Sequence, residues 1–253
     1  MSSASRRVLI LGGTGEALAL AEALAGDPRI ETITSLAGRT RMPSRPPGRM
    51  RIGGFGGLNG LLDYLRSEGI HALVDATHPF AERISQSAVG AAWAAEVPLL
   101  RLERPPWQRQ ADDFWIEVRR LEDAAALAPR HGARALLTVG ARDLGAFARI
   151  ESVWFLVRLI EAPQEPLPLS RYELLLDRGP FPAAAELRLL EERRIDMVIA
   201  KNSGGDATYG KIAAARALAL PVIMLRRPPG PAEAPETVTT VEAAARWVRE
   251  RMA

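Results

Sequence analysis

Short apolar runs alternate along the chain with longer segments rich in Ala and Leu. Val8–Leu11 is a run of consecutive apolar residues, which predicts a strand buried on both faces. Ala17–Ala25 has the composition of a helix. The same alternation predicts strands at Ile30–Ser35, Met50–Ile52, His71–Asp75 and Pro98–Leu102, and helices at Leu58–Ser67 and from Thr77-His78-Pro79 to about Ala95.

The alternation breaks near residues 103–113, at Arg104-Pro105-Pro106-Trp107, and then resumes. Further strands are predicted at Trp115–Val118, Arg134–Thr138, Val153–Arg158, Met197–Ala200 and Pro221–Leu225, with helices at Leu121–Arg130, Pro182–Arg193, Thr208–Leu218 and Val241–Arg251. This order predicts two Rossmann-like, doubly wound α/β domains with mainly parallel sheets and an inter-domain cleft. We expect the domains to comprise residues 1–103 and 104–253.

Composition narrows the function classes. Of 253 residues, 47% are hydrophobic and 25% are charged, which is typical of a globular protein. The chain contains no cysteine, which excludes disulfides and thiolate chemistry. A net charge of +3 with few aromatic residues does not favour nucleic acid as a partner. We expect a cytoplasmic monomer without a membrane segment that binds an anionic small molecule.

Glycines follow the first predicted strand, in Gly12-Gly13-Thr14-Gly15. A strand, a glycine-rich turn and a helix together place backbone N–H groups and the positive end of a helix dipole against a phosphate. The turn departs from the G-x-G-x-x-G fingerprint, because Thr14 and Ala17 occupy the later glycine positions. An ordinary first turn of an α/β fold is the alternative interpretation.

The loop after the second predicted strand is basic and hydroxyl-rich. An NAD site would offer a carboxylate there, whereas this chain offers Ser35, Arg39 and Thr40. These groups suit a 2′-phosphate and favour NADP, although a solvated basic loop would have the same composition.

Two further segments follow strands of the first half. Gly53 and Gly54 allow a ligand to approach the backbone closely, or form a flexible turn. Thr77 and His78 either begin a helix or face the ligand, where His78 could move a proton near neutral pH.

The second half offers a candidate anion site. Arg142 and Lys211 both fall in a predicted first helical turn, where a cation opposes the helix dipole unless an anion binds. Both could instead point into water. Lys201 and Lys211 are the only lysines of the chain, which favours a place that needs a compact ammonium group.

Several chemistries are excluded by missing motifs. No Tyr is followed four residues later by Lys, and the chain has no phosphate-binding P-loop and no G-x-S-x-G elbow. Its histidines, His71, His78 and His131, lack metal-ligand spacing, so no metal site is predicted.

Taken together, the motifs resemble those of the precorrin-6A reductases, NADPH-dependent enzymes of cobalamin biosynthesis. The most specific are Asp75-Ala76-Thr77-His78-Pro79-Phe80-Ala81 and Lys201-Asn202-Ser203-Gly204-Gly205; Gly12–Glu16, Arg104–Trp107, Thr138-Val139-Gly140 and Lys211 accompany them. The resemblance implies hydride transfer from NADPH to the double bond between macrocycle carbons 18 and 19, giving precorrin-6B. Such a substrate carries many carboxylates, which agrees with the predicted anion site.

With this resemblance we expect the following roles. The cofactor-binding residues are Gly12, Gly13, Thr14, Gly15, Ser35, Arg39, Thr40, Gly53, Gly54 and Thr77. The substrate-binding residues are Arg104, Thr138, Gly140, Arg142, Lys201, Ser203, Gly204 and Lys211, and the catalytic residues are His78, Lys201 and Ser203. Another NADP-dependent reductase or epimerase of an anionic substrate, or a non-catalytic dinucleotide sensor, is the alternative.

Overall fold

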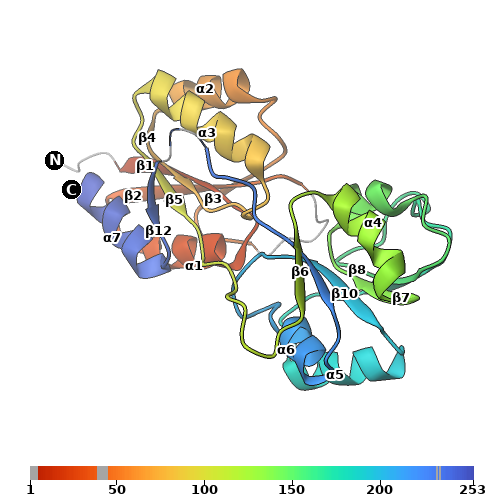
Figure 1. The fold of residues 1–253 in the computed structure, drawn as a ribbon. Helices are drawn as coiled ribbons and strands as arrows, with labels where there is room; N and C mark the ends of the chain where they lie inside the picture. Colours follow the sequence, from red (N-terminus) through yellow and green to blue (C-terminus); the bar gives the residue numbers. More distant parts are fainter. Residues whose placement is uncertain (1–4, 39–44, 232, 234) are drawn as a thin grey trace. The chain divides into compact units, whose positions relative to one another are not determined.

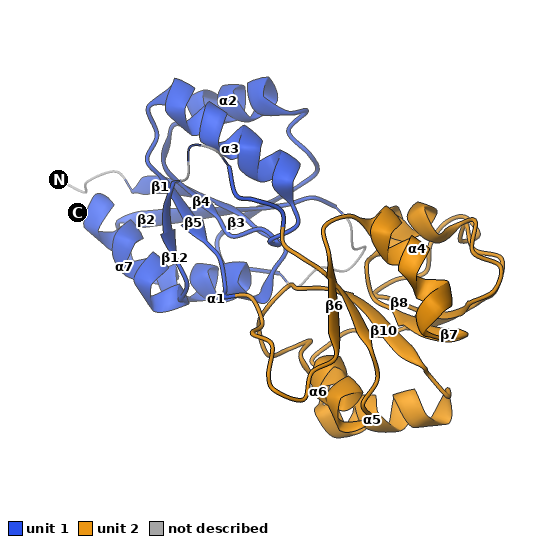
Figure 2. Ribbon diagram, viewed as in Figure 1, with its two compact units in different colours: residues 1–105, 228–253 blue, residues 106–227 orange. Residues whose placement is uncertain are grey.

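The computed structural model describes residues 5–38, 45–231, 233 and 235–253. They form two compact units, residues 1–105 with 228–253 (unit 1) and residues 106–227 (unit 2) (Figure 2). Each unit consists of one parallel sheet with helices on its faces (Figure 1).

Unit 1 contains a six-stranded sheet in the order β12-β5-β4-β1-β2-β3. Its strands are β1 (Arg6–Leu11), β2 (Ile30–Leu36), β3 (Arg49–Ile52), β4 (Ile70–Asp75), β5 (Leu99–Leu102) and β12 (Glu236–Val238). Its helices are α1 (Gly15–Leu24), α2 (Leu58–Ser67), α3 (Glu82–Ala95) and α7 (Val241–Arg251). Helices α1 and α7 pack together on one face of the sheet, and α2 and α3 on the other (Figure 1).

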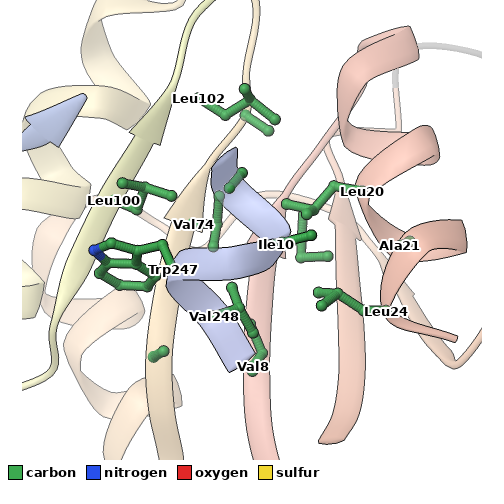
Figure 3. Close-up of a cluster of buried hydrophobic side chains, with 14 of the residues drawn as sticks. Val8, Ile10, Leu20, Ala21, Leu24, Val74, Leu100, Leu102, Trp247 and Val248 are labelled. Carbon is green, nitrogen blue, oxygen red and sulfur yellow. The ribbon is translucent and has the colours of Figure 1, made fainter. Parts of the chain in front are cut away.

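The predicted two-sided burial of the first strand is confirmed. Val8 and Ile10 point into a cluster with Leu20, Leu24 and Trp247 beneath α1 and α7 (Figure 3). Leu9 and Leu11 lie in the opposite cluster beneath α2 and α3. Because successive side chains of a strand point to opposite faces, a fully apolar strand belongs at the centre of a sheet covered on both sides.

Unit 2 contains a second six-stranded parallel sheet, in the order β6-β11-β10-β7-β8-β9. Its strands are β6 (Trp115–Val118), β7 (Arg134–Leu137), β8 (Trp154–Leu159), β9 (Tyr172–Leu176), β10 (Met197–Lys201) and β11 (Val222–Leu225). Its helices are α4 (Leu121–His131), the 3₁₀ helix η1 (Ala141–Phe147), α5 (Ala183–Glu192) and α6 (Gly210–Ala217). Residues of α5 and α6 form a core cluster with β7, β8, β10 and β11.

The two sheets have the same topology, although the sequence shows no repeat. In both, three strands run outward from the middle in one direction and two in the other, as in a Rossmann fold. The two units exchange their sixth strands. Strand β6 follows β5 of unit 1 in the chain but belongs to the sheet of unit 2, and β12 follows β11 of unit 2 but belongs to the sheet of unit 1. Residues 228–253 therefore belong to unit 1, and not to the second domain as the division at residue 104 placed them.

Three elements differ from the predicted ones. Helix α3 begins at Glu82, later than Pro79, because Thr77 and His78 form a turn held by their own hydrogen bonds. Strands β9 and β12 were not predicted. Both pair with one neighbour at a sheet edge, where exposure weakens the hydrophobic pattern on which prediction depends.

Candidate functional site

The glycine-rich turn lies at the carboxyl end of β1, in the middle of the unit 1 sheet. Strand order reverses direction between β1 and β4, and ligands of open α/β sheets bind at such a switch point. Gly13 has φ +106°, which strongly favours glycine. A Cβ on Gly13 or Gly15 would meet no atom within 4 Å, so the backbone is open to a ligand there.

Thr14 fixes the shape of this turn. Its hydroxyl donates to the carbonyl oxygen of Ala76 at 2.7 Å and accepts from the backbone N–H of Ala17 at 3.1 Å, which caps α1. The hydroxyl thus joins the turn after β1 to the turn after β4. A phosphate at this place would be held by backbone N–H groups and the helix dipole.

Arg104 lies in unit 1 and forms an ion pair with Glu16 at 2.8 Å. Glu16 is in the first turn of α1, where its carboxylate would otherwise repel a phosphate. Arg104 was predicted to bind the substrate, whereas this contact gives it a second role, neutralising the carboxylate beside the glycine-rich turn.

The end of β2 carries no carboxylate within its described residues 33–38. Ser35 is buried, and its hydroxyl accepts a hydrogen bond from Arg51 Nη1 at 2.9 Å. Arg51 was not singled out in the sequence, because only the pairing of β3 with β2 brings it beside Ser35. Arg39 and Thr40 lie outside the described residues, so their predicted role stays a prediction.

A buried ionic network follows β4. Asp75 accepts from the N–H of Thr77 at 3.1 Å and from its hydroxyl at 2.6 Å. The other carboxylate oxygen accepts from Arg101 at 3.1 Å, and Arg101 also pairs with Glu103. Asp75 and Arg101 are at most 8% exposed. Sequence analysis missed Asp75 as the residue that orients Thr77, although it heads the specific motif.

His78 lies half-buried in the turn that Thr77 begins. Its Nδ1 accepts from the N–H of Phe80 at 3.3 Å, which restrains the orientation of the ring. Gly53 and Gly54, also predicted for the cofactor, present their carbonyl oxygens to Arg51.

In unit 2, the turns after β7 and β10 lie side by side, because these strands are neighbours. Lys201, at the end of β10, pairs with Asp143 of η1 at 2.5 Å. Thr138 donates from its hydroxyl to the carbonyl oxygen of Ile199 at 3.2 Å. Gly140 has φ +97°, so the turn between Thr138 and Arg142 needs glycine. Thr138, Gly140 and Arg142 thus follow β7, beside Lys201 at the end of the neighbouring strand β10, and their role in substrate binding stays a prediction.

The loop Lys201–Gly205 is held in place from two sides. Asn202 exchanges two hydrogen bonds with the backbone of Trp107, at 2.8 and 3.0 Å, and the Trp107 indole donates to Gly205. Arg227 donates to the carbonyl oxygens of Asn202 and Ser203. Ser203 and Gly204 are buried beneath these contacts. These bonds explain why Trp107 accompanies the Lys-Asn-Ser-Gly-Gly motif.

Lys211 lies in the interior of unit 2. It lies in the first turn of α6, as predicted, but it is 5% exposed. Its ammonium group donates to the carbonyl oxygen of Thr208 and lies 4.9 Å from the Trp107 ring centre. Burial lowers the pKa of Lys211 to about 7. This position differs from the predicted contact with substrate carboxylates, since the side chain supports Trp107 and the first turn of α6.

Exposed arginines gather at the carboxyl ends of the unit 2 strands. They are Arg119 and Arg120 after β6, Arg142 after β7, Arg178 after β9, and Arg226 after β11. Exposed apolar side chains lie at the same edge, with Ile160 following β8 and Leu176 ending β9. Arg120 forms an ion pair with Glu122, and the other four arginines together with these apolar side chains suit a polycarboxylate with an apolar body.

Within the described residues, no cluster of His, Asp and Glu could hold a metal ion. The helices of this part of the chain are all too short or too polar to cross a lipid bilayer.

Comparison with known proteins finds close relatives over almost the whole chain. A family model described as "Precorrin-6x reductase CbiJ/CobK" matches residues 7–249. Precorrin-6A reductase of Rhodococcus erythropolis is 50% identical over 96% of this chain and 97% of its own length. That of Rhodobacter capsulatus is 43% identical over 96% of each chain. A solved structure named "CobK precorrin-6A reductase" matches with a TM-score of 0.91 at 42% identity, over 97% of both chains.

Proposed function

The chain belongs to the precorrin-6x reductase family, and we propose that it transfers a hydride from NADPH to precorrin-6A, giving precorrin-6B. The choice of NADPH rests on the side chains at the carboxyl end of β2. Ser35 and Arg51 are in contact there, and the described part of this end has no carboxylate to bind ribose hydroxyls.

The residues of unit 1 fit a nicotinamide dinucleotide. We assign the pyrophosphate to the backbone of Gly12, Gly13, Thr14 and Gly15, which is open at Gly13 and Gly15. The ion pair of Glu16 with Arg104 lowers the negative charge at this place. When bound, NADPH supplies the hydride.

The turn after β4 would face the nicotinamide end of the cofactor, because that end lies across the switch point from the first turn. Asp75 and the Thr14–Ala76 hydrogen bond hold this turn in a single arrangement. We also assign Gly53 and Gly54 to the cofactor site, and their hydrogen bonds to Arg51 support this assignment. We assign His78 to orientation of the reacting groups or to proton movement.

Unit 2 would bind the carboxylates of precorrin-6A. Arg142 and Lys201 stand at the carboxyl ends of neighbouring strands, and Thr138, Gly140, Ser203 and Gly204 shape the turns that carry them. The exposed arginines of the same edge add positive charge, and Ile160 and Leu176 offer apolar surface to the macrocycle. The Lys201–Asp143 pair keeps the ammonium group in a fixed position, from which it can bind a carboxylate or donate a proton.

An anaerobic assay with precorrin-6A and either NADPH or NADH tests this proposal. We expect kcat/KM to be at least about tenfold higher with NADPH, since a charged hydrogen bond to the 2′-phosphate contributes about 1.5–3 kcal/mol. Equal values for the two cofactors would contradict the choice of NADPH. Binding of NADPH without its oxidation by precorrin-6A would instead indicate a dinucleotide sensor.

A further inference from the structure

We infer that Arg51 distinguishes NADPH from NADH by binding the 2′-phosphate of the adenosine ribose. The inference rests on the proposed function and assigns the selective contact to a residue of β3, whereas sequence analysis assigned it to Ser35, Arg39 and Thr40, at the end of β2 and in the loop that follows.

The register of the sheet places Arg51 at the required position. Ser35 and Arg51 are paired residues of the parallel strands β2 and β3, and Arg51 Nη1 donates to the Ser35 hydroxyl at 2.9 Å. In Rossmann-like folds the ribose of the adenosine half lies at the carboxyl end of the second strand. The guanidinium group of Arg51 is thus beside the point at which a 2′-phosphate and a 2′-hydroxyl differ.

The guanidinium group is held in a fixed orientation before any ligand binds. Nη1 also donates to the carbonyl oxygen of Gly53 at 2.9 Å, and Nη2 donates to that of Gly54 at 3.1 Å. The group lies 3.9 Å from the centre of the Phe55 ring and 5.1 Å from that of Tyr64. A fixed planar fork loses little entropy on binding a phosphate, which favours selectivity.

The positive charge of Arg51 is not neutralised within the described part of the chain. All its acceptors are neutral oxygens, and no described carboxylate lies within ion-pair distance. Arg49, two residues earlier on the same strand, instead pairs with both Glu31 and Glu68. Arg51 is half-buried, so water and salt screen its charge less than that of an exposed arginine. An anionic ligand would therefore bind favourably to its guanidinium group.

Two small ligands that share the adenosine half test Arg51 directly. Calorimetry measures the affinity of the full-length protein for 2′,5′-ADP, which carries the 2′-phosphate, and for 5′-AMP, which lacks it. Arg51→Met removes the charge and keeps the apolar stem, and Arg51→Lys keeps the charge without the fork. Arg49→Met is the matched control, since it removes a cation from the same face of the same strand.

We expect the natural protein to prefer 2′,5′-ADP roughly tenfold or more, since hydrogen bonds to charged groups are strong. Arg51→Met should abolish this preference with little change for 5′-AMP, Arg51→Lys should retain part of it, and Arg49→Met should retain all of it. If Arg51→Met kept the preference for 2′,5′-ADP, or lost affinity equally for both ligands, the inference would be overturned and the NADPH proposal would still stand. Failure of the natural protein to bind either nucleotide would overturn the proposed function as well.

Discussion

The hydroxyl of Thr14 and the carbonyl oxygen of Ala76 lie 2.7 Å apart and join the two turns on either side of the unit 1 switch point. The same hydroxyl caps α1 through the N–H of Ala17. One side chain therefore sets both the glycine-rich turn and the start of the segment that contains Thr77 and His78.

Thr14→Val is expected to lower the free energy of unfolding by about 1–2 kcal/mol, because the cap and the carbonyl partner are both lost. The affinity for NADPH should fall in parallel. Thr14→Ser keeps the hydroxyl and should retain most of both properties. Urea denaturation and NADPH titration measure them, and equal stability of the Val and Ser variants would contradict this role.

Arg158 and Glu186 form a bidentate ion pair in the interior of unit 2, at 2.9 and 2.7 Å, with both side chains at most 5% exposed. Glu186→Gln should destabilise the protein by about 3–5 kcal/mol, because it leaves a buried guanidinium group without its counter-ion. The double variant Arg158→Met/Glu186→Leu should recover most of the loss. A double variant as unstable as Glu186→Gln would show that the pair acts through more than its charges.

Lys211 should make stability depend on pH. Its pKa is about 7 in the folded protein and 10.5 in the unfolded chain, so between these values the unfolded chain binds more protons. The stability of the natural protein relative to Lys211→Met should therefore rise from pH 7.5 to pH 9.5, by up to about 1.4 kcal/mol per pH unit. Denaturant titrations of both proteins at several pH values measure the difference. A flat difference would contradict the lowered pKa.

Arg142 should contribute to substrate binding through its charge. Arg142→Gln is expected to raise KM for precorrin-6A about two- to fivefold, as befits an exposed charge contact, with KM for NADPH unchanged. The increase should shrink at high salt. Arg130→Gln is the control, because Arg130 is an exposed arginine at the opposite, amino end of β7. An equal change in the two variants would indicate an effect of net charge alone.

Much of the fold could be predicted from the sequence, because central strands have strong local signals. The consecutive apolar residues Val8–Leu11 occupy the middle of a doubly covered sheet, as their pattern predicts. The place of β12 could not be predicted in this way. Its three residues pair with β5, more than a hundred residues earlier in the chain, and nothing local in Glu236–Val238 specifies that partner.

The candidate site was predictable where it consists of single loops. The turn Gly12–Gly15 and the loop Lys201–Gly205 follow their strands as expected. Arg51 escaped notice because its importance depends on the register between β2 and β3. Lys211 was placed on the correct helical turn, but the direction of its side chain depends on packing against Trp107, which no local pattern encodes.

Hydride transfer is tested most directly with NADPH that carries deuterium at both positions of its reactive nicotinamide carbon. The protein is incubated anaerobically with this cofactor and precorrin-6A, and the macrocycle is analysed by mass spectrometry. We expect precorrin-6B that contains a single deuterium, bound to carbon and stable to exchange with water. Reduced macrocycle without deuterium, or labelled NADPH left unoxidised in the presence of precorrin-6A, would contradict the account.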